Sequence, residues 1–187
     1  MIYIVDNFLP NDILIKLNKY LVDFREVDTG DKKFWVMDSN ADLDSWMINK
    51  LSNIEGREIN NILSFFRISN TEVDTDWRIH CDSIIQGELP NRALVLYLSE
   101  EGNDKLNGTA LWEHKDYGIQ MPYDKLTTEE FNNLILNESN NLDTWKLNTV
   151  IGYKKNRLVS YPSNYFHSKY PNVSWEEGRK IFVMFYK

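Results

Sequence analysis

The chain has a single cysteine, Cys81, and no apolar stretch that approaches the roughly 20 residues needed to cross a bilayer. One cysteine excludes an intrachain disulfide and is typical of a protein from a reducing compartment. The opening MIYIVDNFLPND carries acidic residues where a signal peptide needs a basic flank and a longer apolar run. These features predict a soluble, cytoplasmic protein that does not enter a membrane.

The chain also lacks an excess of basic residues. Its 21 Lys and Arg residues against 28 Asp and Glu residues give a net charge of -7, with no long basic run. Binding to nucleic acid through phosphate neutralisation is therefore disfavoured, whereas a small anionic ligand held by one or two cations is compatible. Hydrophobic residues make up 42% of the 187 positions. This composition predicts one packed domain over residues 1–187 and leaves the oligomeric state open.

Two helices are expected near the N-terminus, followed mainly by strands. One helix is expected over residues 13–22, and the other from Asp42 or Asp44 to near Gly56. Short apolar or aromatic runs separated by Asn, Gly, Ser, Asp and Pro are typical of strands. The expected strands are residues 2–5, 34–37, 62–68, 77–82, 92–99, 109–114, 147–153, 157–161 and 180–186. This order predicts an α+β fold in which helices support an antiparallel double sheet on one side.

Residues 115–146 lack the alternation of a strand and form an insertion between two expected strands. Within this insertion, LTTEEFNNLIL (126–136) predicts a helix that is capped by Thr127 or Thr128 and has acidic residues in its first turn. A long excursion of this kind is either a lid over a site or a decorated surface loop. The sequence leaves both interpretations open.

Histidine is scarce, with three in the chain, and one of them lies in the stretch RIHCDS. His80 and Asp82 are two positions apart in an expected strand, so their side chains share a face and Cys81 points the opposite way. His167 follows RLVSYPSNYF, in which a strand and a Pro-Ser turn would direct it toward the His80–Asp82 pair. Two imidazoles and one carboxylate leave open positions on a metal, an arrangement used by non-haem iron(II) oxygenases and also compatible with catalytic zinc.

The last expected strand opens with two cations, Arg179 and Lys180. Alternation places Arg179 on one face with Ile181 and Lys180 on the other with Phe182, so one cation begins inside an apolar face. A buried cation requires a partner, and this strand contains no acidic residue. A carboxylate of a small molecule suits arginine best, because its planar fork donates two parallel hydrogen bonds. The alternative is that both cations lie at the solvated end of the strand.

The order of these motifs resembles that of the Fe(II)- and 2-oxoglutarate-dependent oxygenases. It runs from H-x-D through the strand RALVLYLS and the turn Gly108-Thr109-Ala110-Leu111 to a distal histidine and a basic residue beyond it. The opening IYIVDNFLPND is similar to prolyl-hydroxylase-like members, and NGTALWEHKDYG is similar to a stretch in uncharacterised bacterial and phage members. The resemblance implies a double-stranded β-helix (a cupin-like jelly roll) with supporting N-terminal helices and a helical insertion around 115–146.

The resemblance also implies a set of site residues. His80, Asp82 and His167 would hold Fe(II), and Arg179 would bind the distal carboxylate of the cosubstrate 2-oxoglutarate. The G-x-K pattern of many members would select Lys180 instead of Arg179. Further candidates are two aromatic residues that could line the pocket and one histidine that could contact substrate or cosubstrate: Trp77, Tyr97 and His114.

Members of this family use O2 to decarboxylate 2-oxoglutarate to succinate and CO2 while they oxidise a second substrate. Halogenating relatives lack the carboxylate that Asp82 provides, so the resemblance favours hydroxylation or a related oxidation of an unidentified small-molecule or peptide substrate. Two other functions remain open. One is a non-catalytic jelly-roll protein that binds a ligand in the same cleft. The other is a zinc hydrolase, which explains the histidines and the aspartate but not Arg179.

Overall fold

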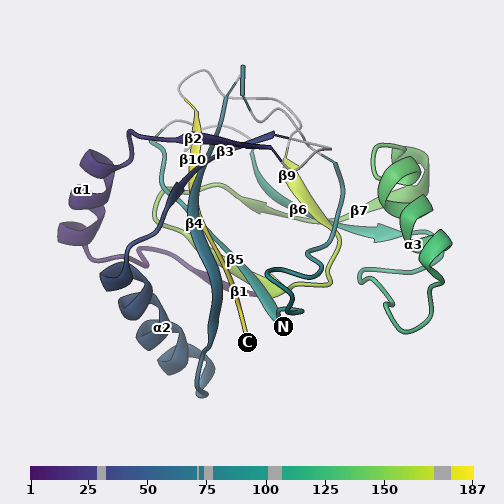
Figure 1. Cartoon of the computed structure of the whole chain (residues 1–187), viewed down its shortest axis with the longest axis horizontal. Helices are drawn as coiled ribbons and strands as arrows, with labels where there is room; N and C mark the ends of the chain where they lie inside the picture. Colours follow the sequence, from purple (N-terminus) through teal and green to yellow (C-terminus); the bar gives the residue numbers. More distant parts are fainter. Residues whose placement is uncertain (29–32, 71, 74–77, 101–106, 171–177) are drawn as a thin grey trace.

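The computed structural model describes residues 1–28, 33–70, 72–73, 78–100, 107–170 and 178–187. They form two sheets in which every strand pair is antiparallel (Figure 1). The large sheet has the order β1-β8-β5-β10-β4-β3-β2, with β1 (Tyr3–Val5), β2 (Arg25–Asp28), β3 (Lys33–Asp38), β4 (Asn61–Ser69), β5 (Arg92–Tyr97), β8 (Leu158–Pro162) and β10 (Arg179–Tyr186). The small sheet has the order β7-β6-β9, with β6 (Gly108–His114), β7 (Trp145–Gly152) and β9 (His167–Tyr170).

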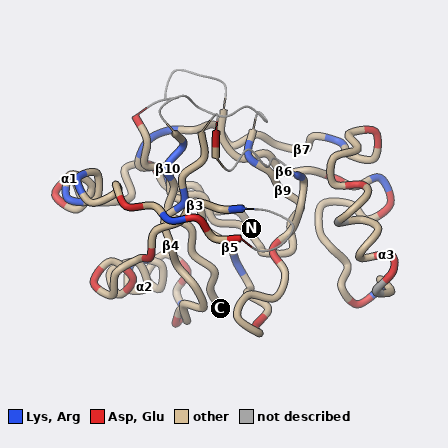
Figure 2. The backbone as a smooth tube through the Cα atoms, turned by 45° about the horizontal axis from the view of Figure 1, so that its top comes forward, with Lys and Arg blue, Asp and Glu red and all other residues tan. Residues whose placement is uncertain are grey.

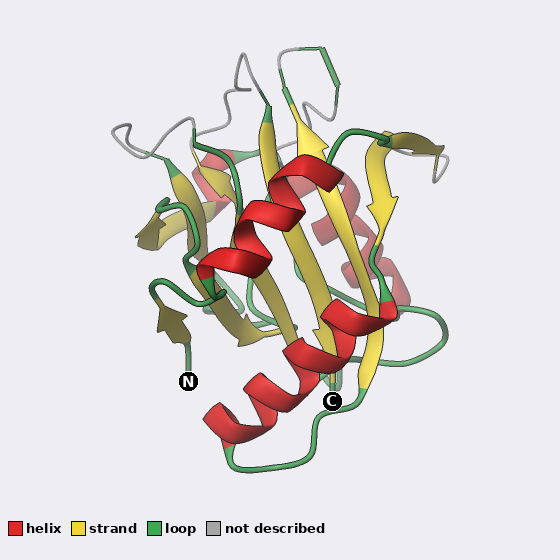
Figure 3. Cartoon of the chain, turned by 90° about the vertical axis from the view of Figure 1, so that its left-hand side faces the viewer, coloured by secondary structure: helices red, strands yellow, loops and turns green. Residues whose placement is uncertain are grey.

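Two helices, α1 (Asn11–Tyr20) and α2 (Ala41–Glu55), lie across one face of the large sheet (Figure 3). The N-cap of α2 is Asn40 rather than the expected Asp42 or Asp44, and its side chain accepts the Leu43 N–H. The helix ends as expected at Gly56, whose φ of 68° is left-handed. The apolar layer between the helices and the sheet includes Leu17, Leu21, Met47, Leu51, Phe66, Phe182, Met184 and Tyr186.

The opposite face of the large sheet packs against the small sheet. Alternation along β10 sends Ile181, Val183 and Phe185 into this inner layer, while Phe182 and Met184 face the helices. The inner layer joins both sheets, because it also contains residues of β5, β6, β7 and β8: Ala93, Val95, Tyr97, Leu111, Ile151, Val159 and Tyr161. The expected double antiparallel sheet with helices on one side is therefore confirmed.

One expected strand is not observed, and two observed strands were not expected. The two strands missed are β2 and β9, which are short and carry charged or polar residues, so they lack an apolar alternation. The run 77–82 is not a strand within its described residues, where only His80 forms an isolated bridge. The other expected strands lie at β1, β3, β4, β5, β6, β7, β8 and β10.

The insertion 115–146 lies beside the small sheet, on the side of the molecule away from α1 and α2 (Figures 1 and 2). Its helix α3 (Thr128–Asn133) is shorter than expected and continues into a π-helical turn, η1 (Leu134–Glu138). Thr127 is the cap, and it forms a reciprocal capping box with Glu130. A short 3-10 turn, η2 (Leu142–Thr144), then leads into β7. None of the described helices is long and apolar enough to cross a membrane.

A close approach between β6 and β7 requires glycine at one position. Gly108 has a φ of 153°, and a Cβ atom there would overlap the carbonyl oxygen of Ile151. Gly152 lies directly opposite Gly108 in the ladder, but a Cβ atom there would meet nothing closer than Arg157 Nη1 at 3.9 Å. The backbone approach therefore requires glycine at position 108 but tolerates a Cβ atom at position 152.

We expect Gly108→Ala to lower the free energy of unfolding by about 2 kcal/mol or more, since the new methyl group must displace β7. Gly152→Ala should change it by less than about 1 kcal/mol. Urea unfolding followed by circular dichroism measures both values. Equal effects of the two substitutions would contradict this account of the Gly108 position.

Candidate metal and carboxylate site

Two of the histidines face each other across an antiparallel backbone pair. The His80 N–H donates to the His167 carbonyl over 3.0 Å, and the His167 N–H donates to the His80 carbonyl over 2.7 Å. The Asp82 N–H donates to the Ser163 carbonyl over 2.9 Å. These bonds attach the segment that carries His80 and Asp82 to the turn after β8 and to the start of β9. The expected approach of His167 to the His80–Asp82 pair is therefore observed.

Backbone carbonyl groups determine which nitrogen of each ring faces the site. Nδ1 of His80 lies 2.8 Å from the carbonyl oxygen of Arg78, and Nδ1 of His167 lies 2.9 Å from that of Tyr165. A carbonyl oxygen only accepts, so each Nδ1 carries the hydrogen and Nε2 is the unprotonated nitrogen of the neutral ring. A neutral imidazole oriented in this way is the form that binds a metal.

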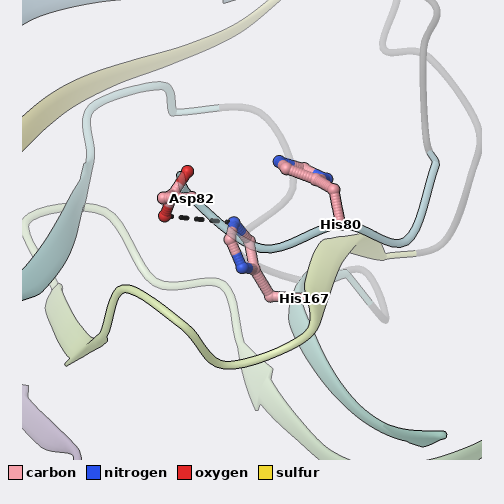
Figure 4. Close-up of side chains that lie close together, drawn as sticks. All are labelled: His80, Asp82 and His167. Atoms are coloured by element: carbon pink, nitrogen blue, oxygen red, sulfur yellow. Dashed lines mark ion pairs between the residues drawn. The ribbon is translucent and has the colours of Figure 1, made fainter. Parts of the chain in front are cut away.

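The side chains of His80, Asp82 and His167 point toward one another (Figure 4). Their ligand atoms lie within 4.8 Å of one another, and His167 Nε2 is 3.7 Å from Asp82 Oδ2. The two imidazole centroids are 4.4 Å apart. Within the described ranges, no other three His, Cys, Asp or Glu side chains come together in this way. Two imidazoles and one carboxylate at this spacing fit a divalent transition metal such as iron(II) or zinc.

Cys81 points away from this group, as strand alternation predicts. Its side chain is buried in a separate apolar cluster with Ile79 and Phe166, and Sγ lies 3.4 Å from the Tyr123 hydroxyl oxygen. Burial raises the pKa of the Cys81 thiol from 9.0 to about 12. The thiol is therefore not one of the candidate metal ligands.

Arg179 is a buried cation on the inner face of the large sheet. It opens β10, is 8% exposed and shares its face with Ile181. Among the described residues its Nε has no hydrogen-bond partner, and Nη2 makes a long contact of 3.5 Å to the Gly108 carbonyl oxygen. Over the part of the chain that the structure describes, no carboxylate forms an ion pair with it. A buried guanidinium in this state fits a bound carboxylate.

Lys180 lies on the opposite face. Its Nζ donates to the Leu21 carbonyl oxygen over 3.1 Å, beside the layer that α1 forms against the sheet. The alternative assignment of the ligand-binding cation to Lys180 is contradicted by this contact. The physical reason is strand alternation, which turns consecutive residues of β10 to opposite faces. The other alternative placed both cations at the solvated end of the strand. It is wrong for Arg179, which is buried.

Buried tyrosines lie next to both parts of the site. Tyr97 lies beside Arg179, whose guanidinium carbon is 5.5 Å from the ring centroid, and its hydroxyl is 2.7 Å from Thr109 Oγ1. Burial raises the pKa of Tyr97, and Arg179 acts in the opposite direction. The ring of Tyr161 is 4.8 Å from that of His167.

Burial raises the pKa of Tyr161 well above its ordinary value, and the charge of Asp82 raises it further. The charge of Arg179 lowers the pKa of Tyr161, so charges from both parts of the site act on this hydroxyl. Tyr161 was not among the residues predicted to lie at the site. The signal was its place in the run 157–161, where alternation puts it on the inner face with Val159.

His114 is not brought to this group. It is 3% exposed and lies in the insertion cluster, where its ring stacks on Tyr117 and meets Trp145 edge-on. The Asp116 N–H donates to Nδ1, so Nε2 carries the hydrogen that is donated to Glu138 over 2.7 Å. His114 is thus a buried anchor for the insertion rather than a pocket residue. The other aromatic candidate, Trp77, lies outside the described residues.

Solved structures with low sequence identity share this arrangement of elements. HygX from Streptomyces hygroscopicus, solved with nickel, 2-oxoglutarate and hygromycin B, is 12% identical with a TM-score of 0.59; the match covers 99% of this chain and 82% of HygX. A Pseudomonas putida prolyl-4-hydroxylase is 11% identical with a TM-score of 0.57, and the match covers 100% of this chain and 91% of that enzyme. This chain has the fold of the Fe(II)- and 2-oxoglutarate-dependent oxygenases.

A third similar structure, AviO1 from Streptomyces viridochromogenes Tue57, is 11% identical with a TM-score of 0.60 over 99% of this chain and 88% of AviO1. Neither protein-family models nor curated protein sequences give a match. The likeness therefore rests on the fold. The roles of individual residues rest on the geometry described above.

The buried thiol allows a direct test of the orientation of the 80–82 segment. Because the pKa of Cys81 is raised from 9.0 to about 12, its thiolate population at pH 8 should be about a thousandfold smaller than that of an ordinary cysteine. We expect the native protein to react with Ellman's reagent at least that much more slowly than the urea-unfolded protein. The native rate should rise as the pH rises toward 12. Rapid reaction of the folded chain would show that Cys81, and with it the segment, is turned differently.

Proposed function

We propose that the protein is a non-haem Fe(II)- and 2-oxoglutarate-dependent dioxygenase that hydroxylates a small molecule or a peptide, with release of succinate and CO2. One observation carries the proposal. Two histidines and an aspartate are gathered as a metal-ligand set, and the inner face of the large sheet carries a buried arginine with no counterion among the described residues. We further propose that the two antiparallel sheets form the double-stranded β-helix of this family.

The residues present fit both the metal and the cosubstrate. Nε2 of His80, Nε2 of His167 and a carboxylate oxygen of Asp82 would hold the iron, because both imidazoles are already oriented by their Nδ1–H bonds. Arg179 would bind the distal carboxylate of 2-oxoglutarate, which would satisfy its orphaned Nε. When bound, iron(II) and 2-oxoglutarate together supply the means to activate O2 for oxidation of a C–H bond.

The chain's own contribution is binding, orientation and exclusion of water. Arg179 lies beside the Tyr97 ring, on the same inner face of β10 as Ile181, so a carboxylate bound there would lie in a medium of low dielectric constant. In such a medium an arginine–carboxylate pair is stronger than in water, because water does not screen the two charges. The hydrogen bond between the Tyr97 hydroxyl and Thr109 holds the Tyr97 ring in place beside the guanidinium. The ring therefore limits the space for a ligand there.

The ligand set bears on the type of oxidation. Asp82 provides a carboxylate ligand, which supports hydroxylation over halogenation, where a halide needs that position. A structure with a similar fold, SnoN from nogalamycin biosynthesis, is described as an α-ketoglutarate-dependent epimerase; it is 10% identical with a TM-score of 0.56 over 99% of this chain and 75% of SnoN. The fold therefore accommodates reactions other than hydroxylation, and product analysis must decide between them.

We expect His167→Ala and Asp82→Ala to abolish succinate release from 2-oxoglutarate and to reduce iron(II) content while the domain stays folded. Each substitution removes one of three ligands, and a bidentate remainder binds iron(II) poorly. Anaerobic metal analysis, succinate assay and circular dichroism provide the measurements. Full succinate release by either variant would defeat the proposal. Tight binding of zinc without any turnover would favour a hydrolase.

Arg179 and Lys180 form a matched pair of adjacent cations on opposite faces. We expect Arg179→Met to weaken 2-oxoglutarate binding about 30-fold or more, because loss of the partner of a buried charge costs at least about 2 kcal/mol. Lys180→Met should leave this affinity within about twofold, as its Nζ bonds to Leu21. The visible charge-transfer band of the anaerobic iron complex reports the titration. An equal loss in both variants would contradict the assignment of the cosubstrate carboxylate to Arg179.

A further inference from the structure

The insertion 115–146 packs directly behind the segment that carries His80 and Asp82. The Ile79 N–H donates to the Ser139 carbonyl over 3.0 Å, and the Tyr123 hydroxyl donates to the Asp82 carbonyl over 2.8 Å. An apolar cluster accompanies these bonds and joins the segment to the insertion; it contains Ile79, Cys81, Met121, Leu134, Trp145 and Phe166. The insertion is therefore attached to the segment through both backbone and side-chain contacts.

The same part of the insertion also holds the segment that leads to His167. The Met121 N–H donates to the Asn164 carbonyl over 2.8 Å, and the Phe166 N–H donates to the Ile119 carbonyl over 3.0 Å. Residues 119–123 are thus bonded to the chain on both sides of the site. Movement of this short stretch would change the positions of all three candidate ligands together.

The insertion contacts the back of the site rather than its open side. Cys81 and Phe166 face the insertion, whereas their neighbours His80, Asp82 and His167 face one another on the other side of the backbone. The contacts of the described insertion residues are therefore those of a support. Among the described residues, the insertion makes no contact on the open side of the site that would support its interpretation as a lid.

Tyr123 makes the most specific of these contacts. Its single hydroxyl hydrogen is donated to the Asp82 carbonyl, so the Cys81 thiol at 3.4 Å is the donor in the second contact. The Asp82 N–H is bonded on the other side to Ser163. The two bonds fix the peptide groups on either side of the Asp82 Cα atom, which sets the direction of its carboxylate.

We propose that Tyr123 is a positioning residue of the metal site, which holds the Asp82 backbone so that the carboxylate meets the same ion as His80 and His167. This inference rests on the proposed function, because it takes the three side chains as metal ligands. It adds a role for the insertion, which supports the ligands from behind. Groups that orient metal ligands typically contribute about 10- to 100-fold to metal affinity.

Cobalt(II) titration of the metal-free protein tests the proposal without any need for turnover. We expect Tyr123→Phe, which keeps the ring in its apolar cluster, to bind cobalt(II) about tenfold more weakly than the wild type and with a shifted d–d absorption spectrum. The matched control is Tyr117→Phe in the same insertion, since the Tyr117 ring stacks on His114 and its hydroxyl makes no hydrogen bond to the described residues. This variant should keep both the affinity and the spectrum of the wild type.

Thermal unfolding of the metal-free variants completes the design. An unchanged affinity and spectrum in Tyr123→Phe would overturn the positioning role, and so would equal weakening in both variants. A Tyr123→Phe protein that is soluble but unfolded would overturn it as well, because the hydroxyl would then hold the fold instead of the ligand. If the wild-type protein binds no cobalt(II), the proposed function itself fails, which is distinguishable from the other outcomes.

Discussion

The backbone pair between His80 and His167 is the constraint on which the site depends. Two hydrogen bonds of 3.0 and 2.7 Å place these residues directly opposite each other, and this spacing brings their imidazole centroids to 4.4 Å. The rings are then oriented by carbonyl groups two residues earlier in the chain, in the same way on both sides. The placement of the two histidines thus comes from backbone bonds, and the chemistry comes from the side chains that these bonds place.

The second half of the site is an electrostatic arrangement. Arg179 is buried beside the Tyr97 ring, and its Nε finds no partner in the described part of the chain. Leaving a buried donor unpaired costs about 1–3 kcal/mol, and more for a charged group. A bound ligand that accepts a hydrogen bond from the group would remove this cost. The same burial that destabilises the ligand-free protein would strengthen the binding of the proposed carboxylate.

Strand alternation allowed much of this to be predicted from the sequence. It assigned His80 and Asp82 to one side and Cys81 to the other, and the structure agrees. It also put Arg179 and Lys180 on opposite faces, although which face is the inner one depends on the packing of the two sheets. Alternation depends only on an extended backbone, so the sequence predicts which side chains share a face wherever the chain is extended.

What could not be predicted depends on tertiary contacts. His114 resembled a pocket residue because it ends a strand near the expected site, but its partner Glu138 lies in the insertion. The cap of α2 was misplaced because Asn40, Asp42 and Asp44 have similar capping propensities. The short strand β9 has no apolar alternation of its own and is defined by its pairing with β6. The support that Tyr123 gives to Asp82 has no local signature at all.

If the two facing histidines hold a metal as proposed, occupancy of the site also raises the thermodynamic stability of the whole domain. They are 167 − 80 = 87 positions apart, so the unfolded chain does not hold them together. An ion that binds only the native pair shifts the folding equilibrium by mass action, by about 2.7 kcal/mol at a free concentration one hundred times its dissociation constant. Metal supply would then govern how long the protein persists in a cell, in addition to whether it can react.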